Sequence, residues 1–402
     1  MDIVVAGAGH AAIQLAATLR QGGHGGAITL VAPETGLPYQ RPPLSKAYLA
    51  GELDEAGLAL RPAPFFATQR IDLIAGDRVV AIDRAARCVA LASGKCLPYG
   101  HLVLATGAEN RRLDVPGAGL PGVMGLRSHA DALALRAKLP SLRRVAVVGA
   151  GFIGLEFAAV AAARGIAVTV LEAAPRPLLR GVSATMSAHI AAVHRGWGTR
   201  LLTSTGVTAI HGTTHATAVK TDTGEIVPAD LVLVAIGVVP LAGLAASAGL
   251  AVGNGVLVDE MLRTGDPDIS AIGDCACFPL PGQTAPIRLE SVQNAADQAR
   301  AVAERLLGRA APYAKLPWFW SDQGPLKLQI AGLSAGHDLA VMRGDPAGGA
   351  FSVFCFAGGR LVAVESLNRP TDHMLARKLL TSDVRLTPAQ CSDLGFDLRQ
   401  AG

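Results

Sequence analysis

The feature that most constrains this chain is a short pattern that occurs twice. Residues 3–12 read IVVAGAGHAA and residues 145–154 read VAVVGAGFIG. In both, a run of β-branched residues leads into a glycine-rich turn and then into an alanine-rich stretch. This order predicts a strand, a tight turn and a helix, with further strands expected over residues 27–32 and 167–172. Strands that alternate with helices indicate parallel sheets with right-handed crossovers, and therefore an α/β protein.

Three positions of each turn have separate tasks. The first residue permits the tight turn, the second lets the backbone approach a pyrophosphate, and the third lets the helix pack on the strand. These positions are Gly7, Gly9 and Ala12 in the first turn, and Gly149, Gly151 and Gly154 in the second. One such turn is weak evidence, because glycine-rich strand ends also occur in plain turns. Two turns in the same context predict two bound dinucleotides in one chain.

An acidic residue follows each turn near the end of the next strand. Glu172 can accept hydrogen bonds from both hydroxyls of an adenosine ribose, and its charge would repel a 2′-phosphate, which favours NADH over NADPH. Arg176 and Arg180 leave NADPH open, because a nearby arginine can accommodate that phosphate; alternatively they are exposed loop cations. Glu34 is the corresponding candidate after the first turn, and its alternative is a solvated loop charge.

Composition sets the broad class. Half of the 402 residues are hydrophobic and 17% are charged, which excludes a disordered chain, and no run of like charges suggests a nucleic-acid partner. The chain opens without the pattern of a secretory signal, and its longest apolar runs fall short of the roughly 18 residues that suggest a membrane span. We therefore expect a cytoplasmic protein without nucleic-acid or membrane contacts. The net charge of +4 fits an acidic partner weakly.

The cysteines and histidines suggest no metal or disulfide chemistry. Six cysteines in a chain of this length predict no disulfide framework, and no pair has the C-x-x-C spacing of a redox or zinc site, so we expect a reducing compartment. None of the ten histidines belongs to an H-x-x-x-H or H-E-x-x-H pattern, and no metal is expected.

Six longer strings make the comparison with a known family specific. They are LPYQRPPLSKAYL (37–49), LVLATGA (102–108), AIGVVP (235–240), SAIGDCA (270–276), ESVQNAADQA (290–299) and PWFWSDQG (317–324). In this order and at these spacings the chain resembles, essentially end to end, the bacterial FAD-containing, NADH-dependent ferredoxin reductases, the group that includes putidaredoxin, palustrisredoxin and biphenyl-dioxygenase ferredoxin reductases.

The resemblance implies the fold and its division. The fold expected is α/β and glutathione-reductase-like, with two Rossmann-type dinucleotide-binding domains and an α+β C-terminal domain. Strand-like segments after residue 325 agree with the last of these. The domains expected are the first part of an FAD-binding domain (1–109), an NAD-binding domain (110–238), the second part of the FAD-binding domain (239–315) and the C-terminal domain (316–402).

The resemblance also implies two cofactor sites. The residues expected at FAD are Gly7, Gly9, Ala11, Ala12, Glu34, Arg41, Lys46, Val79, Arg127, Asp274 and Val292. Those expected at NAD are Gly149, Gly151, Ile153, Gly154, Glu156, Glu172, Arg180 and Gly237. Relatives carry an additional aspartate where this chain has Pro33, so the adenosine end of FAD is expected to be held less tightly, or by Glu34 alone.

Three residues are expected at the reacting end. Lys46 would lie against the isoalloxazine and stabilise negative charge on the reduced flavin. Glu156 would approach the nicotinamide and pair with Lys46, although a glutamate early in a helix also gains from the helix dipole. Trp320 resembles the aromatic at the flavin edge, against the nicotinamide or the docked ferredoxin. The alternative for Lys46 is a lysine that caps a loop helix.

The function implied is the transfer of electrons from NADH through FAD to a 2Fe-2S ferredoxin that feeds an oxygenase, either a haem-thiolate monooxygenase or a ring-hydroxylating dioxygenase. Dithiol exchange is not expected, because no cysteine occurs between residues 1 and 87. Rival hypotheses are a rubredoxin, monodehydroascorbate or oxygen reductase of the same fold, and a signalling flavoprotein of the apoptosis-inducing-factor type. The protein is expected to be a monomer or a homodimer.

Basic residues could form a docking surface for an acidic electron acceptor, with ordinary solubility charge as the alternative. The candidates are Arg61, Arg288, Arg300, Arg305, Lys315 and Lys327.

Overall fold

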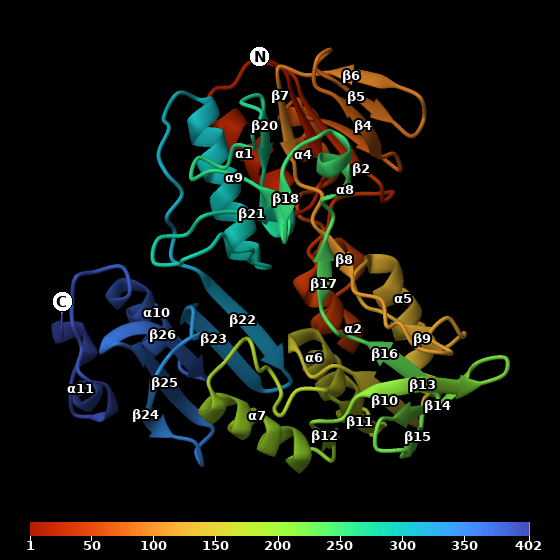
Figure 1. Ribbon diagram of the computed structural model, residues 1–402, viewed down its shortest axis with the longest axis vertical. Helices are drawn as coiled ribbons and strands as arrows, with labels where there is room; N and C mark the ends of the chain where they lie inside the picture. The colour runs from red at the N-terminus through yellow and green to blue at the C-terminus, as the bar shows by residue number, and fades with distance from the viewer. Residues whose placement is uncertain (402) are drawn as a thin grey trace. The chain divides into compact units, whose positions relative to one another are not determined.

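A computed structural model describes residues 1–401 (Figure 1). The chain forms two compact units, each assembled from separate stretches. The first unit holds residues 1–40, 55–109 and 238–315, and the second holds residues 41–54, 110–237 and 316–402. The segment that contains the RPPLSK string thus belongs to the second unit, and the division into three domains remains a prediction.

The centre of the first unit is a parallel sheet whose strands follow the order β20-β7-β1-β2-β3. Its middle strand, β1 (Ile3–Ala6), is buried at every position, because a central parallel strand is covered on both faces. The other strands are β2 (Ile28–Ala32), β3 (Asp72–Ala75), β7 (His101–Leu104) and β20 (Ile269–Ala271). Helices α1 (His10–Gln21) and α9 (Val292–Leu306) lie side by side against this sheet (Figure 1).

Smaller elements complete the first unit. Two three-stranded sheets have the orders β4-β5-β6 and β18-β19-β21. Their strands are β4 (Val79–Asp83), β5 (Cys88–Leu91), β6 (Cys96–Pro98), β18 (Val252–Gly253), β19 (Gly255–Leu257) and β21 (Ala276–Cys277). The short helices are α3 (Glu55–Leu58), α4 (Ala63–Thr68), α8 (Gly243–Ser247) and the 3₁₀ turn η3 (Gly273–Cys275).

The second unit repeats the parallel design, with the order β12-β11-β10-β16-β9. These strands are β9 (Val123–Met124), β10 (Arg144–Val148), β11 (Ala167–Leu171), β12 (Arg200–Leu202) and β16 (Leu231–Val234). The associated helices are α2 (Ala47–Ala50), α5 (His129–Lys138), α6 (Phe152–Ala162) and α7 (Ala184–Gly196), with 3₁₀ turns η1 (Pro42–Ser45) and η2 (Leu139–Ser141). An antiparallel sheet joins β13 (Val207–Gly212), β14 (Ala216–Thr221) and β15 (Ile226–Pro228). The chain leaves and re-enters the first unit along β8 (Ala108–Asn110) and β17 (Val238–Pro240).

The C-terminal part of the second unit is an antiparallel sheet with the order β22-β23-β26-β25-β24. Its strands are β22 (Trp318–Gln323), β23 (Leu326–Gly332), β24 (Leu339–Asp345), β25 (Ala350–Ala357) and β26 (Arg360–Leu367), and α10 (Pro370–Leu379), α11 (Pro388–Ser392) and η4 (Leu398–Ala401) follow. Two parallel sheets of the Rossmann type and an α+β C-terminal part confirm the predicted fold class. Among residues 1–401, no helix is both long and apolar enough to cross a lipid bilayer.

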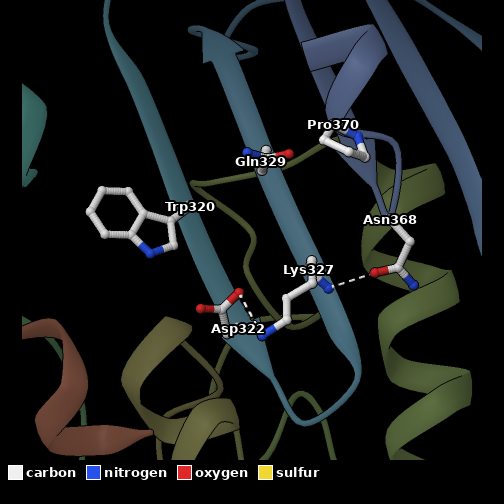
Figure 2. Close-up of a pocket in the computed structure, with 6 residues that line it drawn as sticks. All are labelled: Trp320, Asp322, Lys327, Gln329, Asn368 and Pro370. Carbon is white, nitrogen blue, oxygen red and sulfur yellow. Dashed lines mark hydrogen bonds and ion pairs between the residues drawn. The ribbon is translucent and has the colours of Figure 1, made fainter. Parts of the chain in front are cut away.

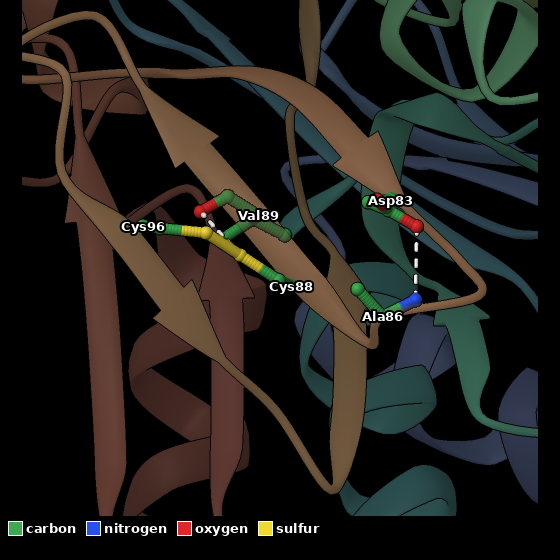
Figure 3. Close-up of a disulfide and its surroundings, with 5 residues drawn as sticks. All are labelled: Asp83, Ala86, Cys88, Val89 and Cys96. Carbon is green, nitrogen blue, oxygen red and sulfur yellow. Dashed lines mark hydrogen bonds between the residues drawn. A yellow bond between two sulfur atoms is a disulfide. The ribbon is translucent and has the colours of Figure 1, made fainter.

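Two cysteines depart from the prediction that disulfides are absent. Cys88 and Cys96 form a disulfide that links β5 to β6 (Figure 3). The hairpin register pairs Cys88 with Pro98 and Ala90 with Cys96, so the two cysteines are diagonal neighbours on one face. Their Cα atoms lie 6.3 Å apart, within the range that a disulfide spans. The two cysteines are eight residues apart in the sequence, and this spacing alone does not predict a disulfide. The pairing depends on where the hairpin turns.

A thiol count tests this disulfide. The other four cysteines are unbonded and buried. Protein alkylated in denaturant without reductant is therefore expected to show four thiols by mass spectrometry, and six after reduction. The variant Cys88→Ser should show five without reductant, because Cys96 is released. Six thiols in the unreduced wild-type protein would contradict the bond.

Candidate functional site

The glycine-rich turn of the first unit leaves space at the start of α1. Gly7 has φ = 126°, and a Cβ there would lie 2.2 Å from the carbonyl oxygen of Ala105, so no other residue fits. A Cβ on Gly9 would meet no atom within 4 Å. Gly9 begins the helix and provides no side-chain cap, so the first amides of α1 face that open space.

The turn of the second unit has the same construction. Gly149 has φ = 102°, and its Cβ would lie 2.5 Å from the carbonyl oxygen of Ala235. Gly151 begins α6 without a side-chain cap, and a Cβ there would meet only that oxygen, at 3.9 Å. Gly154 is required by packing, because its Cβ would lie 2.2 Å from the carbonyl oxygen of Gly149.

Three other long helices begin with a serine cap. Ser128, Ser183 and Ser291 cap α5, α7 and α9 by accepting a hydrogen bond from a backbone amide of the first turn. The amides of α1 and α6 lack such a cap and point, with the positive end of the helix dipole, into space that a Cβ would fill. Both turns therefore fit the pyrophosphate of a dinucleotide.

Glu172 is fixed beside the second turn. Its Oε2 accepts from the amide of Ala150 at 2.7 Å, and its Oε1 accepts from the amide of Ala174 at 2.8 Å. Each carboxylate oxygen keeps a further lone pair, so the group can still accept from two ribose hydroxyls. The backbone of the glycine-rich turn itself thus sets the orientation of the predicted ribose acceptor.

The two arginines near Glu172 behave differently. Arg176 donates to the carbonyl oxygens of Leu179 and Ser183, so its guanidinium is used within its own loop. Arg180 is exposed, and its Nη2 lies 3.7 Å from the position of a Cβ on Gly237. Gly237 follows Ala235, which contacts the glycine-rich turn. The structure therefore brings the predicted residues Gly149, Gly151, Arg180 and Gly237 to one place, with Ile153 in the first turn of α6.

A buried carboxylate anchors the loop that carries Arg180. Glu365 of β26 accepts from the amide and from the hydroxyl of Ser183, both at 2.6 Å. Ser183 is the residue at which α7 begins, directly after this loop. Burial raises the pKa of Glu365, and the two hydrogen bonds from Ser183 oppose the rise. The C-terminal sheet thus holds one end of the nucleotide loop, a contact that the sequence did not reveal.

Asp274, one of the predicted flavin residues of the first unit, lies near the start of α1. A Cβ on Gly273 would lie 3.3 Å from that of Ala11, so Asp274 follows at the same helix end. Val292 is the first residue of the neighbouring helix α9, and Val79 begins β4. Glu34 is held by the hydroxyl of Tyr39 and is therefore more than a solvated loop charge.

The proline-rich segment presents its cations within the second unit. Arg41 donates from Nη1 to the carbonyl oxygen of Arg127 at 2.8 Å, which brings two predicted flavin-site residues together. Lys46 stands between η1 and α2, and its side chain is 14% exposed. Its Nζ lies 2.9 Å from Oε1 of Glu156, so the predicted ion pair is present in the structure.

Glu156 lies in a nearly dry environment, since its side chain is 3% exposed. Burial raises the pKa of this carboxyl group, and the charge of Lys46 and the hydroxyls of Ser321 and Ser45 act in the opposite direction. Ser321 donates to Oε1 at 2.7 Å and Ser45 donates to Oε2 at 2.5 Å. The arrangement can hold a fixed negative charge that in turn fixes the ammonium of Lys46.

Trp320 faces away from this pair. Along β22, Ser321 and Gln323 are buried, whereas Trp320 and Asp322 occupy the other face. Trp320 lines a pocket there together with Asp322, Lys327, Gln329, Asn368 and Pro370 (Figure 2). The alternation of a strand therefore separates the third predicted catalytic residue from Lys46 and Glu156 within this unit.

Sequence reasoning missed Ser45 and Ser321 as site residues. Each is adjacent to a predicted residue inside the most specific strings, Ser45 before Lys46 and Ser321 after Trp320. The period of two along a strand would have placed Ser321 on the face opposite to Trp320. Nothing in the sequence indicated that α6 packs against that face.

The prediction of a docking role is wrong for two of the six basic residues. Arg288 has a side chain that is 8% exposed, donates to the carbonyl oxygen of Asp274 and pairs with Glu290. Arg305 is partly buried and bonds to the hydroxyl of Ser270. Both arginines bind structural partners instead of facing a partner protein. The other four, Arg61, Arg300, Lys315 and Lys327, are exposed.

The fold and the two turns are of the kind found in oxidoreductases that bind two dinucleotides. A family model described as pyridine nucleotide-disulphide oxidoreductase matches residues 1–299, and one described as reductase C-terminal matches residues 318–402. The chain belongs to the pyridine nucleotide-disulphide oxidoreductase family. Membership implies FAD and a pyridine nucleotide as cofactors.

Individual relatives narrow the class. The chain is 52% identical over 402 residues to rhodocoxin reductase of Rhodococcus erythropolis. The match covers 100% of this chain and 94% of that protein. The crystal structure of the ferredoxin reductase for the CYP199A2 system of Rhodopseudomonas palustris matches with a TM-score of 0.98 and 50% identity over 100% of this chain and 99% of that chain. Putidaredoxin reductase in its covalent complex with putidaredoxin matches with a TM-score of 0.96 and 38% identity over 100% and 97%. These matches confirm the resemblance to the ferredoxin reductases.

Replacing the second glycine of the turn tests the assigned nucleotide site. In Gly151→Ala the new methyl group meets little protein, so the cost in stability is expected to stay below about 1 kcal/mol. The methyl group would occupy the space at the first amides of α6, and affinity for the pyridine nucleotide should fall about tenfold or more by calorimetric titration. Gly196→Ala, at the open end of α7, is the matched control and should bind normally. Unchanged affinity of Gly151→Ala would contradict the assignment.

Proposed function

We propose that the protein transfers electrons from NADH through FAD to a 2Fe-2S ferredoxin, and that this ferredoxin feeds an oxygenase, either a haem-thiolate monooxygenase or a ring-hydroxylating dioxygenase. The relatives named above are reductases of this kind, and one of them is crystallised with its ferredoxin partner. The match to them covers the whole chain, including the C-terminal part.

The observation that carries the proposal is that the proline-rich segment, residues 37–49, contains no cysteine and presents a lysine instead. Members of the fold that exchange dithiols need cysteine there, whereas this chain presents Lys46, paired with Glu156. The first cysteine of the chain, Cys88, is bonded to Cys96, and the four free thiols are buried. Burial raises the pKa of the Cys275 and Cys391 thiols, the second to about 12, which disfavours the reactive thiolate. Dithiol chemistry therefore has no accessible nucleophile.

The chain's own residues then have definite tasks. The start of α1 and the residues around it would hold FAD, and the start of α6 with Glu172 would hold NADH. Bound FAD supplies the chemistry of accepting two electrons as a hydride and releasing them one at a time. Lys46 provides a positive charge whose position Glu156 fixes, and by resemblance that charge faces the flavin ring, where it would stabilise negative charge. Trp320 would lie at the edge where electrons leave.

Reduction of a ferredoxin tests the proposed function. With NADH in excess, the FAD-loaded protein is expected to reduce an acidic 2Fe-2S ferredoxin with saturation, and added salt should slow the reaction because it screens the attraction between unlike charges. Lys46→Gln should lower the rate, while Lys138→Gln, a charge-matched control at the end of α5, should not. Faster turnover with rubredoxin, monodehydroascorbate or oxygen than with any ferredoxin would contradict the proposal.

Glu172 provides a test of nucleotide choice. In Glu172→Gln the charge that would repel a 2′-phosphate is lost, so the preference for NADH over NADPH is expected to fall by up to about tenfold in kcat/KM. Asp222→Asn is the matched control, because Asp222 also accepts from a backbone amide, that of Gly206, at 2.9 Å. An unchanged preference in Glu172→Gln would show that another group discriminates between the two nucleotides.

A further inference from the structure

A chain of buried polar side chains runs along the buried face of β22 and ends at Glu156. His194 of α7 bonds through Nε2 to Oε1 of Gln323 at 2.8 Å, and Gln323 donates from Nε2 to Oγ of Ser321 at 3.3 Å. Ser321 then donates to Oε1 of Glu156 at 2.7 Å. His194 and Ser321 are fully buried, and Gln323 is 1% exposed. Ser321 belongs to the site described above, whereas Gln323 and His194 have no task in the proposed function.

The hydrogen bonds of this chain all point the same way. An amide oxygen only accepts, so the bond to Gln323 places the proton of His194 on Nε2. Burial lowers the pKa of His194, which therefore stays neutral at ordinary pH. Its Nδ1 has no hydrogen-bond partner among residues 1–401. Each donor thus aims at Glu156, and aligned bonds of this kind strengthen one another in a dry interior.

The charged surroundings of Glu156 are simple. Lys46 faces it from the proline-rich segment, and α6 carries no other charged residue. On β22 the neighbouring acid, Asp322, points to the opposite face, where it pairs with Lys327 at 3.4 Å. His194 is the titratable group at the other end of the chain of hydrogen bonds. The carboxylate is therefore stabilised by one cation and by hydroxyl donors alone.

We propose that Ser321, Gln323 and His194 are positioning residues that keep Glu156 ionised and thereby hold the ammonium of Lys46 in one place. The chain is not a proton pathway, because a glutamine amide does not take up a proton on one side and release one on the other at ordinary pH. It acts by orientation: a protonated Glu156 would carry its proton on Oε1 or Oε2, where Ser321 and Ser45 already donate. The expected effect of these residues on electron transfer rests on the proposed function. Their effect on the charge of Glu156 is independent of that function.

Infrared spectroscopy tests the charge directly. In the FAD-loaded protein, the carboxylic acid band that appears on acidification and is missing in Glu156→Gln reports the protonation of this residue. We expect its midpoint to rise by about one to two pH units in Ser321→Ala, the size that one hydrogen bond to a charged group provides. Gln323→Met should give a smaller rise, and Ser321→Thr, which keeps the hydroxyl, should restore the wild-type midpoint.

A buried serine elsewhere controls for lost stability. Ser352 is fully buried and donates to Asp372 at 2.9 Å, so Ser352→Ala should lower the thermal midpoint without moving the Glu156 band. If Ser321→Ala and Gln323→Met are destabilised in the same way and the band does not move in either, the proposal is overturned.

The rate of ferredoxin reduction separates this proposal from the proposed function. A raised band midpoint together with a pH profile of ferredoxin reduction that shifts equally supports both. A raised midpoint with an unshifted profile supports the positioning role and counts against the task given to Lys46 in electron transfer.

Discussion

The rest of the structure depends on two helices, α1 and α6, that begin at a glycine and leave their first backbone amides open to a ligand. Gly9 and Gly151 provide neither a cap nor a Cβ, so the amides behind them are satisfied when a ligand is bound. Gly7 and Gly149 hold their turns against neighbouring carbonyl oxygens that leave no room for a side chain. The parallel sheets supply the strand ends from which these turns project, and the carboxyl edge of each sheet becomes a binding edge.

Buried acids occur where separate elements of the second unit meet. Glu156 joins α6 to β22 and to the proline-rich segment, and Glu365 joins β26 to the start of α7. A buried carboxylate is costly unless it is paired and fully hydrogen-bonded, and both oxygens of each group accept from close donors. Such a group specifies one arrangement of its neighbours, because any shift would leave a charge without partners. Loops that handle a nucleotide gain rigidity from this requirement.

The sequence was most informative where a rule is local. The two turns, their strands and the segments of the C-terminal sheet follow from glycine positions and hydrophobic period, and the structure has them within a residue or two. The partners of Glu156 depend on which face of β22 meets α6, which is decided by tertiary packing. The same holds for the Cys88–Cys96 bond, which depends on hairpin register, and for Arg288, whose charge is occupied by a carbonyl oxygen and a glutamate that sequence does not place nearby.

β22 joins two surfaces that are subject to different demands. One side of the strand carries Ser321 and Gln323 and is buried. Replacing either residue would leave a buried hydrogen-bond donor or acceptor without its partner. The other side, with Trp320 and Asp322, borders an open pocket. Substitutions at alternate positions are thereby uncoupled: the residues that border the pocket can change while the residues one step along the strand stay fixed. A single strand thus combines a surface that tolerates substitution with an interior that does not.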